Sequence, residues 1–286
     1  MIAITASAFG FAMMAACVRL TDDYGSYIPC FEKSFFRNLV ALIIAVGAFF
    51  RSISSRQNFH YCRPRSVVGF LGLRSVLGTI GIFANFYALS HIPIADGQIL
   101  NKTAPFWTLI FAWMFLGEKV SLRHSAAVAI AFVGAVLVVK PGFAGVDAFP
   151  LAMGLLGGIC AGGAYAAVRA LGRRGINPAM IVLVFSGFSC VVSVPLTMMD
   201  YVPLTWAQFF VLMGAGAGAA IGQFGITLAY RYAAPREIAV FDYTNILFTA
   251  VLGYLLFGQV SDVFSVVGMV VVIAAAFVLS GCRSAH

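Results

Sequence analysis

Long apolar stretches separated by short polar connections follow one another along the whole chain. Each stretch is close to the roughly 20 residues that an α-helix needs to cross the hydrocarbon core of a bilayer. The connections are too short to hold a soluble domain. The pattern predicts ten membrane-spanning helices, at 2–20, 34–50, 66–89, 94–116, 122–140, 151–171, 179–199, 207–230, 237–257 and 262–281.

The composition excludes a water-soluble globular protein. Of the 286 residues, 62% are hydrophobic and only 10% are charged, whereas soluble domains are about 45–50% apolar and about 25% charged. The first apolar stretch follows no basic segment and precedes no clear small-residue cleavage site, so we expect a retained span rather than a signal peptide. The expected fold class is an all-α integral membrane protein.

The formal net charge of +8 is explained by membrane topology rather than by a nucleic-acid site. If the N-terminus is cytoplasmic, only Arg19, Lys33 and Lys140 fall on the outer side. The inner side then holds Arg51, Arg56, Arg63, Arg65, Lys119, Arg123, Arg173, Arg174, Arg231, Arg236 and Arg283. This positive-inside pattern predicts a bacterial-type inner (plasma) membrane protein with both termini in the cytoplasm.

The chain repeats itself at a separation of 141 residues. The segment FLGEKVS at 115–121 corresponds to LFGQVSD at 256–262, which aligns Gly117 with Gly258. Other pairs at the same separation are Thr108 and Thr249, Ala88 and Ala229, and Asn101 and Asp242. We infer an internal duplication.

The duplication divides the chain into a first five-helix repeat at 1–142 and a second at 151–281. Because five is an odd number of crossings, the second repeat enters the membrane from the opposite side, and the two repeats are inverted. Inverted repeats are typical of transporters whose substrate site lies near the bilayer midplane.

Several motifs resemble the EamA-type half of the drug/metabolite transporter superfamily, and the resemblance covers essentially the whole chain. These motifs are FFRN at 35–38, YALSHIPIADGQILNKTAPFW at 87–107, FLGEKVS at 115–121 and GAVLVVKPG at 134–142. The second half is more divergent, with Ile246 in place of Pro105 and Gln259 in place of Glu118. The resemblance implies ten helices and alternating access for small metabolites, without implying a particular substrate.

Three basic residues are embedded in the predicted spans. Arg74 lies about eight residues into the third span, or about 12 Å at 1.5 Å per residue. Lys102 lies about eight residues into the fourth span from the opposite side, so both cations approach the middle of a roughly 30 Å core. Arg37 lies about one turn inside the outer end of the second span.

A charge at this depth costs at least about 2.5–3.5 kcal/mol on insertion scales, so it needs a partner or a wet cavity. The embedded carboxylates are Asp242 and the shallower Asp96, fewer than the cations. One interpretation is an ion pair of Arg74 or Lys102 with Asp242. The other is an anionic group of the substrate, since arginine offers two parallel donors to a carboxylate or phosphate.

The substrate-binding residues that we predict are Arg74, Lys102, Arg37, Asn85, Asn101, Asp242, Tyr243 and Asn245. Snorkelling to the outer headgroups is the alternative for Arg37, and it is our interpretation of Arg169. Asp242 is either a static counter-ion or a group that takes up and releases a coupling proton. Lipid-facing or packing positions are the alternative to cavity lining for the aromatic residues Phe86, Tyr87 and Trp107.

Other patterns indicate packing rather than chemistry. The glycines at 214, 218 and 222, and those at 154, 158 and 162, recur every four residues, which places each set on one helix face for close helix contact. The six scattered cysteines are typical of small buried side chains. We find no nucleophile elbow, metal motif or other catalytic constellation, so no enzyme activity, cofactor or metal is expected.

We therefore predict a secondary active transporter for a small polar metabolite that carries an anionic group such as a carboxylate. Exporters of amino acids or other zwitterionic or cationic metabolites are an alternative. A membrane-embedded enzyme acting on lipids and a passive channel are alternatives of other classes. The expected partners are the substrate, the bilayer and a proton as coupling ion, with no nucleic acid; a homodimer is left open.

Overall fold

The computed structural model describes residues 1–54, 65–92, 99–119, 121–139, 147–258 and 263–281, and these ranges contain helices and no strand. The helices are α1 (Ile2–Asp23), α2 (Cys30–Ser54), α3 (Arg65–His91), α5 (Ala104–Leu116), α6 (Leu122–Val139), α7 (Ala148–Arg173), α8 (Pro178–Met199), α9 (Trp206–Tyr232), α10 (Pro235–Asp242), α11 (Thr244–Phe257) and α12 (Val263–Gly281).

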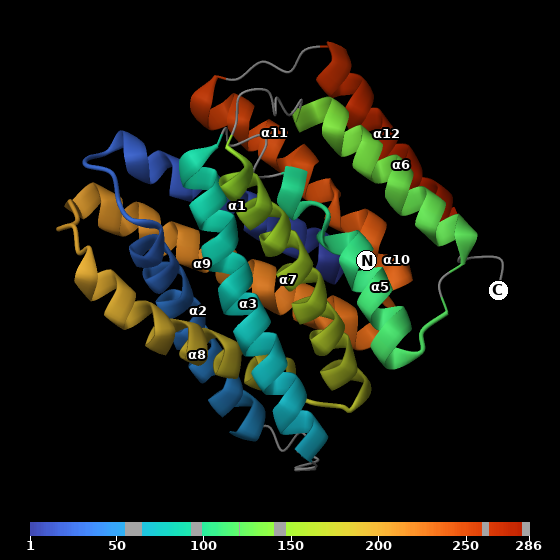
Figure 1. The fold of residues 1–286 in the computed structure, drawn as a ribbon, viewed down its shortest axis with the longest axis horizontal. Helices are drawn as coiled ribbons and strands as arrows, with labels where there is room; N and C mark the ends of the chain where they lie inside the picture. The colour runs from blue at the N-terminus through green and yellow to red at the C-terminus, as the bar shows by residue number, and fades with distance from the viewer. Residues whose placement is uncertain (55–64, 93–98, 120, 140–146, 259–262, 282–286) are drawn as a thin grey trace.

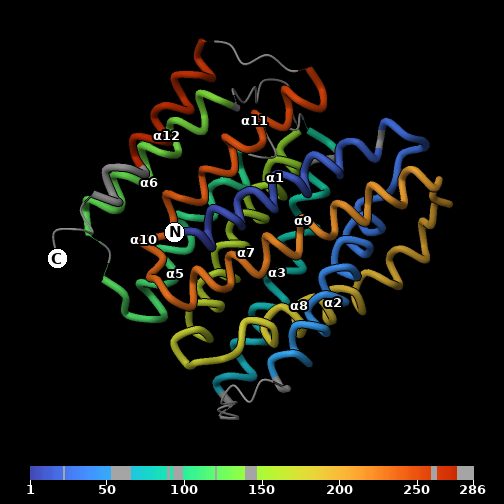
Figure 2. The backbone as a smooth tube through the Cα atoms, turned by 180° about the vertical axis from the view of Figure 1, so that it is seen from behind, coloured from blue at the N-terminus to red at the C-terminus, as the bar shows by residue number. Residues whose placement is uncertain are grey.

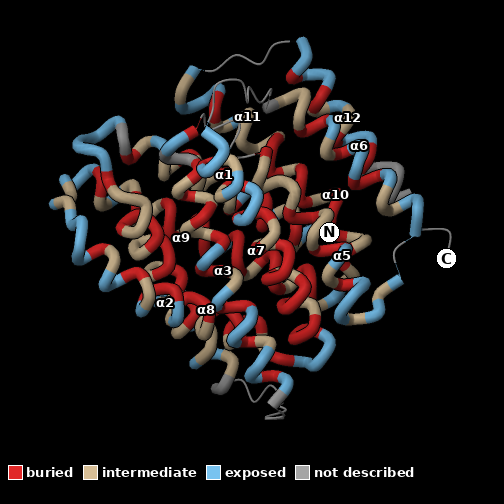
Figure 3. The backbone as a smooth tube through the Cα atoms, viewed as in Figure 1, coloured by how far each residue is buried: buried red, intermediate tan, exposed pale blue. Residues whose placement is uncertain are grey.

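Length and composition make this a multi-pass membrane protein. Among the described residues, eight helical segments are long and apolar enough to cross a membrane, and the segments Leu122–Val138 and Val263–Ala275 are shorter apolar helices. The outer faces of the bundle carry large exposed apolar side chains, including Trp113, Phe210 and Leu255. Buried backbone lies in the middle of the bundle (Figure 3). Apolar residues on the outside suit a lipid solvent.

The most extensive helix contacts join the two halves of the chain. α1 packs along α9, α3 along α7, α2 along α8 and α6 along α12. Figure 1 shows α6 and α12 side by side at one edge of the bundle, and Figure 2 shows α1 beside α9 from behind. The first half therefore has its tightest contacts with the second half rather than with itself.

Glycines permit these close approaches, as their spacing predicts. A Cβ atom on Gly218 would lie 2.8 Å from the carbonyl oxygen of Gly10, so α9 touches the backbone of α1. A Cβ on Gly158 would lie 2.7 Å from the carbonyl oxygen of Leu100, which brings α7 against the fourth span. The glycine stripes are thus packing surfaces, where small residues let helix backbones meet.

The fourth and ninth spans are interrupted, whereas the apolar pattern predicts two continuous helices. The fourth span is helical at 99–101 but resumes as α5 only at Ala104, and the ninth divides into α10 and α11 at Tyr243. Pro105 has no N–H to donate to the carbonyl of Asn101, and Phe106 donates to Thr103 at 3.0 Å instead of to Lys102. The helical hydrogen bonding therefore fails at Lys102.

The two halves also end their long spans alike. Gly117 caps the C-terminus of α5 and Gly258 caps the C-terminus of α11, and both glycines have φ of 64°. This left-handed conformation is strained for residues with a side chain, which explains glycine at both helix ends.

Candidate functional site

A cavity of about 360 Å³ lies among the helices of both halves. Seven of the eight residues predicted for substrate binding line it: Arg74, Lys102, Arg37, Asn85, Asn101, Asp242 and Asn245. The eighth, Tyr243, is fully buried and is not one of the lining residues. Side chains at the end of α1 and the start of α2, Arg19, Tyr27 and Lys33, also line the cavity. The cavity therefore extends from the middle of the bundle to the α1–α2 end.

Arg74 is fixed at the cavity by two neighbours from the second half. Its Nη2 donates a 2.7 Å hydrogen bond to Oε1 of Gln223 on α9. Its guanidinium carbon lies 4.0 Å from the ring centroid of Phe185 on α8, within cation–π range. The side chain is only 2% exposed, and its Nε has no hydrogen-bond partner among the described residues. The guanidinium is positioned by neutral groups and keeps its charge uncompensated.

Arg37 is also buried, at 4% exposure, rather than extended to the outer headgroups. Its Nε lies 2.9 Å from the sulfur of Met14, and its Nη1 donates at 3.4 Å to Oδ1 of Asn38. A thioether is a weak acceptor, and the amide contact is long. The snorkelling alternative for Arg37 is therefore wrong, because the side chain remains inside the bundle.

Lys102 and Asp242 lie at the interruptions of the fourth and ninth spans. They are near enough to attract one another electrostatically, but no ion pair joins Asp242 to Lys102 or Arg74 in the part of the chain that the structure describes. The ion-pair interpretation is thus wrong for this conformation. The other embedded carboxylate that the sequence offers, Asp96, lies outside the described residues.

Two predicted residues make contacts that hold helices together. The hydroxyl of Tyr243 donates a 3.0 Å hydrogen bond to the carbonyl oxygen of Lys102. Nδ2 of Asn245 donates at 2.8 Å to the carbonyl oxygen of Ala8 on α1. By contrast, Oδ1 of Asn85 is buried with no hydrogen-bond partner among the described residues. Their roles in substrate binding stay predictions.

The aromatic candidates separate into lining and packing residues. Phe86 lines the cavity. Tyr87 stacks on His91 with ring centroids 4.0 Å apart, and Trp107 packs beside Phe111. For Tyr87 and Trp107, packing is therefore the interpretation that the structure favours.

The sequence reasoning missed three residues beside the cations. Gln223 is an amide in the middle of an apolar span, and that embedded polarity was a signal we did not use. Phe185 and Tyr165 carry no such signal, because phenylalanine and tyrosine are common throughout the chain. Their places beside Arg74 and in the cavity wall depend on contacts between distant helices.

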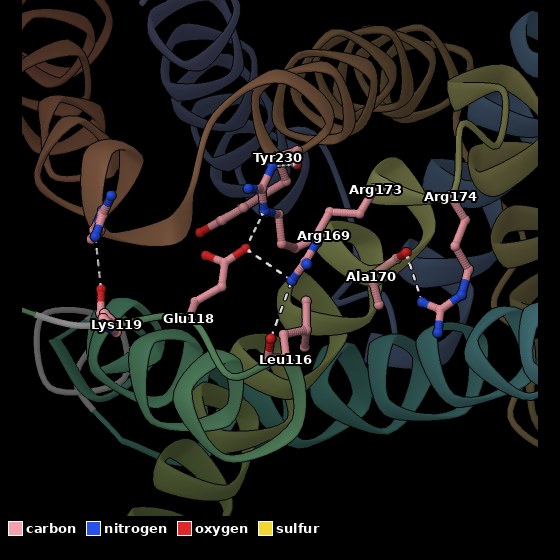
Figure 4. Close-up of polar contacts among 9 residues, drawn as sticks. Leu116, Glu118, Lys119, Arg169, Ala170, Arg173, Arg174 and Tyr230 are labelled. Atoms are coloured by element: carbon pink, nitrogen blue, oxygen red, sulfur yellow. Dashed lines mark hydrogen bonds and ion pairs between the residues drawn. The ribbon is translucent and has the colours of Figure 1, made fainter.

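Polar contacts gather at the opposite end of the bundle, at the end of α5 (Figure 4). Nε of Arg169 lies 2.7 Å from Oε1 of Glu118, and both side chains are about 85% buried, at 15% and 13% exposure. Arg169 also donates to the carbonyl of Tyr230 at 3.2 Å, and Arg173 donates to the carbonyl of Leu116 at 3.1 Å. Arg169 thus forms an ion pair between the halves, which corrects our interpretation of it as a snorkelling residue.

Aromatic side chains connect this end of the bundle to the cavity. Tyr165 lines the cavity and stacks on Tyr230, with ring centroids 5.6 Å apart. Arg169 follows Tyr165 by four residues on α7, so the two side chains share one helix face. The aromatic pair and the ion pair form two successive layers between the cavity and this end.

The chain is similar to known proteins along most of its length. The sequence model of the EamA-like transporter family matches residues 1–140 and 148–281. The chain is 31% identical over 281 residues to the pseudopaline exporter of Pseudomonas aeruginosa, covering 98% of this chain and 95% of that protein. It is 27% identical over 224 residues to the riboflavin transporter of Vibrio cholerae, covering 76% and 72%.

A solved crystal structure shares the fold. Its TM-score with this chain is 0.73 at 16% identity, and the match covers 96% of this chain and 98% of that one. The family match and the relatives indicate a transporter rather than an enzyme. With most of its length matched by the family and an exporter at 31% identity over nearly the whole chain, this protein belongs to the EamA-like transporter family and is a membrane transporter.

Proposed function

We propose that the protein is a secondary active transporter that moves a small metabolite with an anionic group through the central cavity by alternating access. The observation that carries the proposal is the excess of positive charge at depth. Among the described residues, Arg37, Arg74 and Lys102 line the cavity together with one carboxylate, that of Asp242, and none of the three cations forms an ion pair there.

Such buried charges destabilise a membrane protein unless a ligand compensates them. Each buried charge disfavours insertion by at least about 2.5–3.5 kcal/mol. A substrate carboxylate or phosphate would offset that cost on binding, and arginine can hold it through two parallel hydrogen bonds. The 360 Å³ cavity is within the usual range for small-molecule sites.

The architecture that we propose is ten spans in two inverted repeats, at 1–142 and 151–281. The cross-half pairs support it: α1 with α9 is the counterpart of α3 with α7, while α2, α6 and their counterparts α8 and α12 pair directly. Lys102 and Tyr243 are 141 residues apart and contact one another. Two symmetry-related residues that touch must lie at the symmetry axis.

The same symmetry supports alternating access. The cavity extends to the α1–α2 end, while the aromatic and ion-pair layers close the opposite end. Exchange of the two repeats' conformations would close the first end and open the second, as inverted repeats permit. We place the open end outside, with both termini cytoplasmic in an inner membrane, and the exporter among the relatives supports export as the direction.

A second candidate is a zwitterionic substrate such as an amino acid. Asp242 lines the cavity without an ion pair among the described residues, so it could bind a protonated amine. The same carboxylate is our candidate for proton coupling.

Counterflow in proteoliposomes tests the proposal. Vesicles preloaded with a candidate anion should accumulate the labelled anion against its gradient, with saturable kinetics and loss in Arg74→Gln. Non-saturable flux would indicate a channel. Chemical conversion of a lipid without solute flux would indicate the enzyme alternative.

A further inference from the structure

We propose that Arg37 and Arg74 together form one subsite for two negative charges presented side by side, as in a dicarboxylate or a phosphate monoester. The inference rests on the proposed function and specifies its substrate class. It separates a divalent-anion subsite, at α2 and α3, from a second charged pair, Lys102 and Asp242, at the interrupted spans.

The two guanidinium groups share one region of the cavity. They are near enough to repel one another electrostatically, and both interact electrostatically with Tyr165 on α7. Both side chains are more than 95% buried. Two like charges that line one cavity and repel one another away from water favour a ligand that compensates both at once.

Each arginine keeps a terminal nitrogen for a ligand. Arg74 uses Nη2 for Gln223, and Arg37 uses Nε for the Met14 sulfur and Nη1 for Asn38. The remaining nitrogens, Nη1 of Arg74 and Nη2 of Arg37, have no hydrogen bond among the described residues and are not among the atoms sealed from solvent. Two donors from two helices can therefore reach an anion in the cavity.

The charges at the two arginines favour a divalent ligand. The Lys102 ammonium and the Asp242 carboxylate carry opposite charges and attract one another, so this pair is close to neutral. Arg37 and Arg74 then contribute a net charge of +2 with no carboxylate against them in the described part of the cavity wall. A monovalent anion would leave one of these charges uncompensated.

Gly78 makes room for this arrangement. A Cβ atom at Gly78 would collide with Nη1 of Arg74 and lie 2.6 Å from Cε2 of Phe185. Gly78→Ala therefore displaces the Arg74 guanidinium without removing its charge, which separates the geometry of the subsite from its electrostatic attraction.

The test compares ligands of different charge, and two of them, succinate and succinamate, have nearly the same shape. Calorimetry on the purified full chain would use succinate and methyl phosphate as divalent probes and succinamate, which replaces one carboxylate of succinate by an amide. We expect at least one divalent probe to bind about tenfold more tightly than succinamate. Preference for succinate over methyl phosphate, or the reverse, identifies a dicarboxylate or a phosphate monoester.

Variants assign that preference to the two arginines. Arg37→Gln and Gly78→Ala should each reduce the tenfold preference to less than about threefold while succinamate binding persists. Lys33→Gln, which removes a cavity-lining charge near the α1–α2 end, should lower the preference less than Arg37→Gln does, because a distant charge attracts the divalent probe only through long-range electrostatics. Arg37→Lys retains the charge and is the substitute variant if Arg37→Gln fails to fold. It should also reduce the preference, because a lysine ammonium lacks the planar pair of parallel N–H donors of a guanidinium.

Three results would overturn the subsite. They are equal binding of succinate and succinamate, an unchanged preference in folded Arg37 variants, and no binding of either divalent probe. If succinate and succinamate bind equally well and Arg74→Gln loses both, the divalent subsite is contradicted. The proposed anion transporter is not contradicted by that result. Saturable counterflow of a cation with no anion flux would instead contradict the proposed function itself.

Discussion

The hydroxyl of Tyr243 donates a 3.0 Å hydrogen bond to the backbone carbonyl of Lys102, and the two residues are 141 residues apart, the separation of the repeat that the sequence predicts. Tyr243 is fully buried. The carbonyl is available because Phe106 donates to Thr103 instead of completing the helical bond to Lys102. The contact therefore joins the interruptions of the fourth and ninth spans.

Removing this hydrogen bond should weaken the contact between the interruptions of the fourth and ninth spans. Tyr243→Phe leaves the carbonyl of Lys102 buried without its donor, so we expect a loss of about 1–3 kcal/mol in unfolding free energy. Tyr254→Phe on α11 is the matched control, because Tyr254 is 59% exposed on the lipid-facing surface. Thermal unfolding of both variants in detergent measures the difference, and equal melting temperatures would contradict a structural role for the bond.

The contact between α6 and α12 should depend on the absence of a side chain at Gly268. A Cβ atom on Gly268 would lie 2.5 Å from the carbonyl oxygen of Gly134, so Gly268→Ala must push the helices apart. We expect destabilisation of about 1–3 kcal/mol. Gly47→Ala in α2 meets nothing within 4 Å and should be neutral or stabilising, since alanine favours a helix by up to about 1 kcal/mol. Thermal unfolding of the two variants distinguishes the loss of helix packing from the low helix propensity of glycine.

The Glu118–Arg169 ion pair should keep the end beneath the cavity closed. Glu118→Gln introduces the residue that the second repeat carries at its matching position, 259, which lies outside the described residues. We expect faster hydrogen exchange at 112–119 and 165–173, and no change at the α1–α2 end. Arg169→Gln should act alike, and the double variant should add little, with a coupling energy of about 0.5–3 kcal/mol. Additive effects would mean that the two side chains act separately.

Much of the fold could be predicted from the sequence because the bilayer imposes a length on each span. The depths of Arg74 and Lys102 follow from that length, and both side chains do line the cavity. The repeat aligned Gly117 with Gly258, and their conformations match.

Which helices touch does not follow from periodicity, so Gln223 and Phe185 were missed as the neighbours of Arg74.

The partner of Arg169 was missed for a related reason. A basic residue near a helix end is equally compatible with snorkelling and with an ion pair, and only the position of α5 relative to α7 decides between them. Glu118 follows the left-handed Gly117, which turns the chain toward Arg169 at the end of α5. The EamA-like motif contained that glutamate, but the motif alone does not name its partner.

The role of Arg74 can be separated from that of an ion pair with Asp242. Because Gln223 and Phe185 hold the guanidinium, Arg74→Ala should abolish anion-induced stabilisation, and adding Asp242→Asn should not restore it. A melting-temperature series with and without anion measures both effects. Recovery of stability and normal binding in the double variant would show that Arg74 pairs with Asp242 and that the site assignment is wrong.

The charge of Arg74, rather than its hydrogen bond, should decide binding. Gln223→Glu would place a carboxylate where the amide oxygen now lies, 2.7 Å from Nη2 of Arg74. The resulting ion pair should keep or raise thermal stability, while it neutralises the guanidinium and lowers anion affinity at least about tenfold. Gln223→Ala removes the same hydrogen bond but leaves the charge, so it should cost stability and retain most of the affinity. If both variants bind the anion equally well, Arg74 is not the anion's partner, and other cationic residues of the cavity wall, such as Lys102 and Arg37, must hold it.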